Sequence, residues 1–144
     1  MSNCVLSLKA RATGPDLHLC VYINQEQVFS SDLVENTPVT ISHEFDDSVP
    51  KTNTLLIVMA GKTFDHTVLD EKGNILSDSV IEITDVSIDD IELDLVFQEL
   101  SKYSHNFNDT GSPTVQKFYG TMGCNGSVEL EFKSPVYQWL LENM

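Results

Sequence analysis

Basic residues are scarce in this chain. Its 144 residues include eight lysines and arginines against 22 aspartates and glutamates, which gives a formal net charge of −14 at pH 7. A chain this acidic is repelled by phosphate backbones and by anionic lipid headgroups. We therefore expect no nucleic-acid partner and no membrane partner. The excess of acid favours solubility, and it leaves a bound cation or a basic partner as the sharper alternative.

Long apolar runs are also missing. No segment approaches the ~18 apolar residues that a membrane-spanning helix needs. The N-terminal residues do not show the basic region and apolar stretch of a signal peptide. We therefore expect neither a transmembrane segment nor export by a standard signal.

Cysteines are few and odd in number. Cys4, Cys20 and Cys124 cannot all pair within one chain, and none of their spacings matches a zinc knuckle or a redox motif. We expect reduced thiols, with Cys20 packed in the core because it lies within an apolar strand pattern.

Short alternating segments make up most of the chain. Apolar residues occupy every second position in Leu17–Ile23 and Val128–Phe132, and in Val39–Phe45 with His43 in one of the apolar positions, as expected of half-buried strands. The continuous run Leu55–Met59 predicts a central strand covered on both faces. The length suits one domain over residues 1–144, and evenly spaced strands indicate a sandwich or barrel.

The segment Val80–Leu95 alternates with a period of two but changes phase twice. An aspartate stands at each change, first Asp85 and then the pair Asp89-Asp90. Because strand side chains point to alternate faces, a change of phase requires a bulge or a turn. We predict a strand-like segment that bends at these aspartates.

The last third differs in composition. Aromatic residues between Tyr103 and Tyr119 lie among Ser, Asn, Gly and Thr without clear periodicity, which predicts a long ordered loop. Ser134-Pro135 is typical of a helix N-cap followed by a first-turn proline, and the apolar residues after it predict a short terminal helix. The whole pattern predicts an all-β, antiparallel, jelly-roll-like β-sandwich with a short C-terminal helix.

Catalytic motifs are weak. Gly61-Lys62-Thr63 resembles the end of a phosphate-binding loop, but Leu56 stands where that loop requires glycine. Neither Ser127 nor Cys124 lies in a nucleophile elbow. The histidines are scattered and form no local metal-binding pair: His18, His43, His66 and His105. We therefore expect no enzyme activity.

Two sets of residues are candidates for binding. Asp85, Asp89 and Asp90 are candidate ligands for Ca²⁺, which prefers six to eight hard oxygen ligands, and the alternative is that they are solvated turn residues. The second set offers rings and polar tips on which a sugar can stack, the alternative being that they fill the core. Its members are Tyr103, His105, Phe107 and Tyr119.

Two resemblances extend these expectations. Leu17–Leu95 resembles the β-sandwich of calcium-dependent xylan-binding modules, which implies glycan binding without catalysis. Gly61-Lys62-Thr63, the loop 70–74, the run Phe118–Gly126 and the ending Trp139–Met144 resemble small proteins of tailed marine phages, especially cyanophages. That resemblance implies a viral gene product in the virion or the host cytoplasm, and it implies no particular activity.

Together these observations predict a non-enzymatic phage binding module with a carbohydrate-binding or adhesion role, acting on the virion. The alternatives are a structural or decoration protein of the phage particle and an intracellular host-modulating protein. The expected partners are a glycan or other phage structural proteins. Pairing between apolar edge strands leaves a homo-oligomer open.

Overall fold

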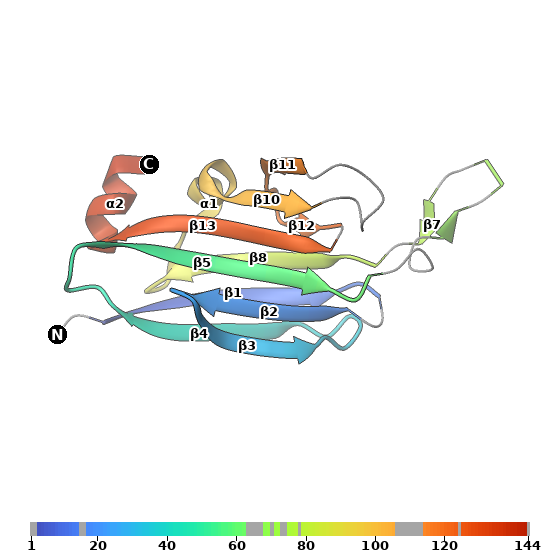
Figure 1. The fold of residues 1–144 in the computed structure, drawn as a ribbon, viewed down its shortest axis with the longest axis horizontal. Helices are drawn as coiled ribbons and strands as arrows, with labels where there is room; N and C mark the ends of the chain where they lie inside the picture. The colour runs from blue at the N-terminus through green and yellow to red at the C-terminus, as the bar shows by residue number, and fades with distance from the viewer. Residues whose placement is uncertain are drawn as a thin grey trace.

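Two antiparallel sheets face each other in the computed structural model, which describes residues 3–14, 17–62, 68–69, 71–72, 75–77, 79–105, 114–123 and 125–143. In the first sheet β8 lies between β1 and the short strands β9 and β12, and β4 follows β1 on the other side (Figure 1). Its strands are β1 (Asn3–Ala12), β4 (Val39–Asp46), β8 (Ile81–Ile88), β9 (Ile91–Glu92) and β12 (Thr121–Met122).

The second sheet has six strands and faces the viewer in Figure 1. Its order is β11 (Thr114–Lys117), β10 (Lys102–His105), β13 (Gly126–Ser134), β5 (Lys51–Ala60), β2 (His18–Ile23) and β3 (Glu26–Asp32). A separate pair joins β6 (Val68–Leu69) to β7 (Ile75–Ser77), and the helices are α1 (Asp94–Leu100) and α2 (Val136–Asn143).

Side chains from both inner faces form one apolar core. Every second residue is buried along β1, and along β13 from Val128 onward, as the sequence alternation predicts. Leu8, Leu19, Leu55 and Leu130 have no exposed surface. Burying such a side chain contributes about 1.5–3 kcal/mol before entropy is counted. The prediction of an antiparallel sandwich with a C-terminal helix is confirmed.

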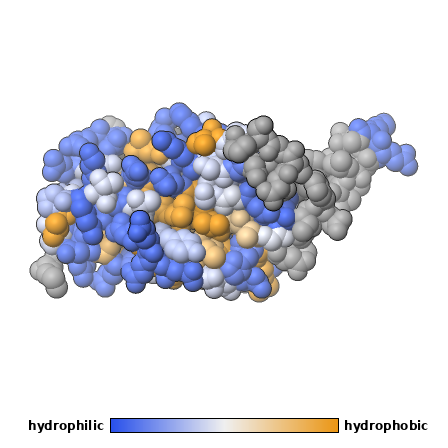
Figure 2. All heavy atoms as spheres, viewed as in Figure 1, coloured by the Kyte–Doolittle hydropathy of each residue, from blue (hydrophilic) through white to orange (hydrophobic). Residues whose placement is uncertain are grey.

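Strand β5 is central, but only one of its faces is covered. It pairs with β13 on one side and β2 on the other. Leu55, Ile57 and Met59 are buried, whereas Leu56 and Val58 are half-buried on the outer face. Figure 2 shows apolar surface in the middle of that face. The prediction of a strand covered on both sides was therefore wrong for the outer face.

The two phase changes of Val80–Leu95 are a bulge and a turn, as predicted. Asp85 has a φ of 53° where the register between β1 and β8 shifts, and Asp89 and Asp90, with φ of 49° and 65°, connect β8 to β9. Aspartate tolerates this left-handed conformation better than most residues. The strand prediction fails beyond Glu92, because α1 begins at Asp94.

The aromatic segment of the last third contains strands. β10 pairs with β13 along Lys102–His105, and β11 pairs with β10. Long-range pairing supplies the backbone hydrogen bonds that the sequence pattern did not indicate. The prediction of a long loop was therefore wrong for these strands, and residues 106–113 lie outside the described part of the chain.

A distant aspartate caps the C-terminal helix. The Val136 amide donates to Oδ1 of Asp47 at 2.8 Å, and Asp47 is buried. Ser134, the expected cap, instead donates its hydroxyl to the Val49 carbonyl at 2.8 Å. The helix holds Trp139 against Phe132 with ring centroids 6.0 Å apart. The predicted helix is confirmed, but its cap comes from tertiary structure.

The segment Gly61-Lys62 is held by the glycine-rich turn near the C-terminal strand. Nζ of Lys62 donates to the Gly123 carbonyl at 2.5 Å, and the Asn125 side chain binds both the amide and the carbonyl of Lys62 at 2.9 Å. Lys62 is buried. Its ammonium group therefore serves a structural contact, in agreement with the rejected phosphate-loop interpretation.

None of the helices among the described residues is long and apolar enough to cross a membrane. The assignment of residues 1–144 to one domain stays a prediction.

Candidate functional site

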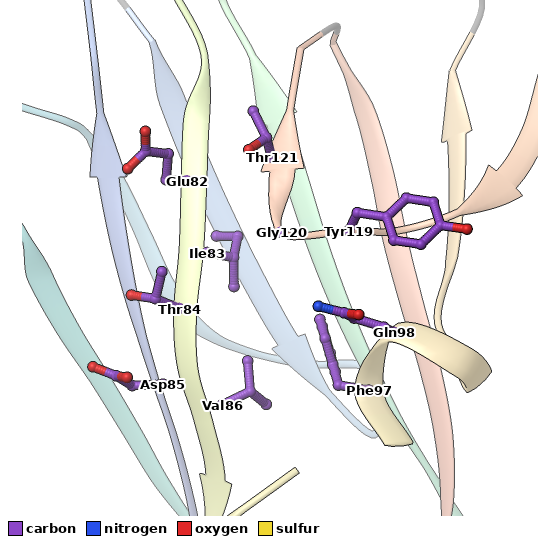
Figure 3. Close-up of a pocket in the computed structure, with 10 residues that line it drawn as sticks. All are labelled: Glu82, Ile83, Thr84, Asp85, Val86, Phe97, Gln98, Tyr119, Gly120 and Thr121. Carbon is purple, nitrogen blue, oxygen red and sulfur yellow. The ribbon is translucent and has the colours of Figure 1, made fainter. Parts of the chain in front are cut away.

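A pocket of about 390 Å³ opens between β8 and α1 (Figure 3). Three segments that are distant in sequence form its walls: the middle of β8, the body of α1 and the residues just before β12. Its lining residues are Glu82, Ile83, Thr84, Asp85, Val86, Phe97, Gln98, Tyr119, Gly120 and Thr121.

The pocket forms where the edge of β8 lacks a neighbouring strand. β12 pairs with β8 at Ile81 and Glu82, and β9 pairs with it at Ser87 and Ile88. Single backbone bonds close the two ends of the gap, from the Ile83 amide to the Gly120 carbonyl at 2.8 Å and from the Leu93 amide to the Val86 carbonyl at 2.9 Å. A four-residue stretch of strand edge, 83–86, therefore borders the pocket.

Apolar side chains form its floor. In Figure 3, Ile83 and Val86 extend from β8 towards the side where α1 lies, and Phe97 extends from α1 towards them. All three are buried. Phe97 also packs edge-to-face on Phe118, with ring centroids 5.8 Å apart. This contact fixes a seven-residue helix that is too short to be stable alone.

Tyr119 and Gln98 form the accessible rim. The Tyr119 side chain is 71% exposed, and Gln98 is half-buried on the neighbouring turn of α1. Gly120, with a φ of 103°, adopts a conformation suited to glycine and turns the chain from Tyr119 into β12. The rim thus combines an aromatic face with an amide that can donate and accept hydrogen bonds.

Both carboxylates of the pocket are paired with cations on β1. Figure 3 shows Glu82, Thr84 and Asp85 on the opposite side of β8 from Ile83 and Val86. Asp85 lies 3.5 Å from Nζ of Lys9, and Glu82 accepts a 2.8 Å hydrogen bond from Arg11. These pairs balance the local charge, so the pocket favours a neutral ligand over a cation.

The predicted sugar-binding residues do not stay together. Tyr119 lines the pocket, but Tyr103 is only 3% exposed and His105 is also buried. The Tyr103 ring lies 4.8 Å from that of His105 and 5.8 Å from Phe118. Phe107 lies outside the described residues. Tyr103 and His105 therefore contribute to the core, and Tyr119 remains the accessible ring.

The predicted calcium ligands have separate roles. Asp85 pairs with Lys9, whereas Asp89 accepts the Val5 amide at 2.8 Å. Lys9 and Val5 are four residues apart on β1, about 13 Å at strand spacing. The described residues contain no group of three His, Cys, Asp or Glu side chains able to hold a metal ion. Asp85 and Asp89 thus make separate contacts along β1, and shared calcium binding by Asp85, Asp89 and Asp90 stays a prediction.

Sequence reasoning missed Phe97, Gln98 and Gly120. The first two lie on α1, beyond Leu95, where the predicted strand-like segment ended, and Gly120 was part of the run Phe118–Gly126 with no predicted binding role. The change of phase at Asp85 gave a local signal in the sequence for this region, and the structure shows it as a positive φ.

Comparison with known proteins relates this chain to others through its fold. No family model and no curated protein sequence matches it. Among solved structures, the selenomethionine form of vCBM60, described with two families of calcium-dependent carbohydrate-binding modules, matches with a TM-score of 0.56 and 8% identity over 90% of each chain. The structure of vCBM60 with galactobiose matches with a TM-score of 0.47 and 9% identity, over 88% of this chain and 96% of its own. The chain thus has the β-sandwich fold of a carbohydrate-binding module.

Proposed function

We propose that this chain is a carbohydrate-binding module whose β8–α1 pocket binds a neutral sugar without catalysing a reaction. The observation that carries the proposal is the exposed Tyr119 ring beside the Gln98 amide and an apolar floor. A fold similar to that of a carbohydrate-binding module supports the same function. Fold alone does not determine function, so the proposal rests on the pocket.

The pocket offers both kinds of contact that a sugar needs. The Tyr119 face provides apolar area for a sugar ring, and Gln98 and Thr121 provide polar atoms for its hydroxyl groups. The volume of about 390 Å³ lies near the lower end of the ~300–1,000 Å³ range of small-molecule sites. We therefore expect it to hold the end of a short oligosaccharide.

The proposed sugar contact uses protein groups alone. Similar folds bind carbohydrates in a calcium-dependent manner, but the described carboxylates near this pocket pair with Lys9 and Arg11. We therefore expect binding here to persist after a chelator removes divalent cations. Loss of binding on chelation would require a metal site that these described residues do not form.

The test is a glycan array followed by calorimetry with the best-bound oligosaccharide. We expect Tyr119→Ala to weaken binding at least about tenfold, or ~1.4 kcal/mol, because the stacking face is lost. Tyr119→Phe keeps the ring and should retain most of the affinity. Tyr137→Ala is the matched control, because Tyr137 is another exposed tyrosine but lies on α2. Absence of glycan binding, or equal affinity for wild type and Tyr119→Ala, would contradict the proposal.

We also propose, from the resemblance to phage proteins, that the module is carried on a virion. The half-exposed apolar positions Leu56 and Val58 on the outer face of β5 support a contact with other structural proteins. Mass spectrometry of purified virions tests this placement. Detection at many copies with no glycan affinity would favour a decoration protein, whereas detection only in the host lysate would favour a host-directed protein.

A further inference from the structure

The outer face of β2 and β3 carries a chain of polar contacts away from the pocket. Oδ1 of Asp32 lies 2.7 Å from Nδ1 of His18, and Nε2 of the same ring lies 3.1 Å from Oγ of Ser30. Because a carboxylate only accepts hydrogen bonds, Nδ1 of His18 donates to Asp32. A neutral imidazole then accepts at Nε2 from the Ser30 hydroxyl.

The strand register explains why these side chains meet. His18 is paired with Asp32 and Cys20 with Ser30. The Leu33 amide donates to the Leu17 carbonyl at 2.8 Å, so Leu17 and Leu33 are a hydrogen-bonded pair. Because such pairs alternate with non-hydrogen-bonded ones, Leu19 and Ser31 form the next hydrogen-bonded pair. His18–Asp32 and Cys20–Ser30 are therefore the closely spaced, non-hydrogen-bonded pairs, whose side chains approach most closely.

We propose that Ser30 is a nucleophile activated by His18 and Asp32, and that it takes an acyl group from an ester. General-base activation of a serine requires a carboxylate, an imidazole and a hydroxyl in that order. One ring nitrogen binds the carboxylate and the other binds the hydroxyl, as they do here. The proposal is independent of sugar binding, because this site lies on the six-stranded sheet and the pocket lies at the edge of the other sheet.

The step balances without a cofactor. Oγ of Ser30 attacks the ester carbonyl carbon while Nε2 of His18 takes the hydroxyl proton. The carbon–oxygen bond to the alcohol then breaks, and the alcohol leaves with the proton from His18. Water reverses the sequence on the acyl-serine, giving the free acid and restoring Ser30. Asp32 keeps the His18 ring oriented and stabilises its charged form.

The backbone of β3 offers a donor to the carbonyl oxygen. β3 is the last strand of its sheet. Ser30 belongs to a non-hydrogen-bonded pair with β2, so its amide points away from β2, towards the open edge of the sheet. A backbone amide of the nucleophile itself is a common contributor to stabilising an oxyanion. One donor in contact with solvent predicts slow turnover.

The openness of the site selects the substrate class. The Asp32 side chain is 88% exposed and that of His18 35%, so the described residues around Ser30 do not enclose an acyl chain. This favours a small acyl ester projecting from the surface of a larger molecule, or a small activated ester in solution. Cys20 is the competing nucleophile, because its Sγ lies 3.4 Å from Oγ of Ser30.

The test uses p-nitrophenyl acetate with the full chain, following nitrophenol release and locating the acetyl group by peptide mass spectrometry. We expect acetylation of Ser30 in the wild type and at least about a tenfold slower release in Ser30→Ala and His18→Gln. Asp32→Asn should slow release as well, although it preserves the shape of the side chain. Thermal melting of each variant shows whether it remains folded.

Two further variants make the result decisive. Ser31→Ala is the matched control, because Ser31 is the next residue on β3 and donates to the Asp32 carbonyl at 2.9 Å. It should leave release unchanged. Cys20→Ala should leave Ser30 acetylation in place. Acetylation of Cys20 or of lysines alone, or equal release by wild type, Ser30→Ala and His18→Gln, would overturn the proposal.

Discussion

Asp89 and Val5 exchange two hydrogen bonds. The Val5 amide donates to Oδ1 of Asp89 at 2.8 Å, and the Asp89 amide donates to the Val5 carbonyl at 2.9 Å. The turn after β8 is thereby attached to the beginning of β1. Asp89, which the sequence suggested as a metal ligand, satisfies backbone groups at the end of the first sheet in this structure.

Replacement of Asp89 by alanine should lower the free energy of unfolding by about 1–2 kcal/mol more than Asp90→Ala. Both residues have a positive φ, so both substitutions carry a similar backbone cost, and only Asp89 holds the Val5 amide. Urea denaturation of the two variants measures the difference. Equal destabilisation would show that the hydrogen bond contributes little.

The Cys4 thiol should make stability depend on alkaline pH. Burial, followed by a hydrogen bond to Asp89, raises its pKa from 9.0 to about 12. The unfolded chain therefore loses this proton at lower pH than the folded chain, and stability falls between pH 9 and 12 by up to about 1.4 kcal/mol per pH unit. Below pH 9 the contribution is fully present.

Urea unfolding at about pH 8 and about pH 11, with Cys4→Ala as the comparison, measures that contribution. Lysines and tyrosines also titrate in this range, but they do so in both proteins. The wild type should lose more stability than Cys4→Ala over the interval. An identical loss would contradict the raised thiol pKa.

Removal of the Asp47 side chain should loosen α2. Asp47→Ala leaves the Val136 amide without its cap, which typically costs about 0.5–2 kcal/mol. Trp139 is the single tryptophan and is buried on this helix, so its fluorescence should shift to longer wavelength. Asp46→Ala is the control, because the Asp46 carboxylate accepts hydrogen bonds from the nearby Ser48 amide and hydroxyl and does not bind the Val136 amide. The same fluorescence change in both variants would argue against a specific cap.

Asn125→Ala should release the segment that follows β5. The substitution removes both side-chain bonds to the Lys62 backbone and should cost about 1–3 kcal/mol. Hydrogen exchange of the Lys62 amide gives the local measurement. Asn125→Asp keeps the acceptor for that amide and should retain more protection than alanine. Unchanged protection in Asn125→Ala would contradict this role.

The local sequence pattern predicted the strands that bury one face in the core. Alternation in Leu17–Ile23 and Val128–Phe132 identified β2 and the buried positions of β13, because strand periodicity is visible in a few consecutive residues. The aspartates at the phase changes were also informative, since Asp85, Asp89 and Asp90 all adopt a positive φ.

The rest depends on contacts between distant segments. Leu93 and Leu95 continue the alternation, yet α1 forms because Val96 and Phe97 are buried against the core. Cys20 is half-buried and contacts Ser30 on the outer face of β2, so its predicted core position was wrong. The pocket needs Phe97, Tyr119 and β8 at one edge, and no local pattern encodes that meeting.

The interrupted edge of β8 also protects the chain against aggregation. An uncovered strand edge presents unpaired amides and carbonyls on which a second chain can pair. β12 and β9 cover the ends of β8, and the left-handed Asp85 distorts the short stretch between them, so an incoming strand finds too few regular positions. Within the described part of the chain, β3, β4 and β11 are the edge strands of the two large sheets that are longer than two residues, so they offer the longest edges for strand addition. Apolar substitutions facing outward on β3 or β4 would therefore reduce solubility.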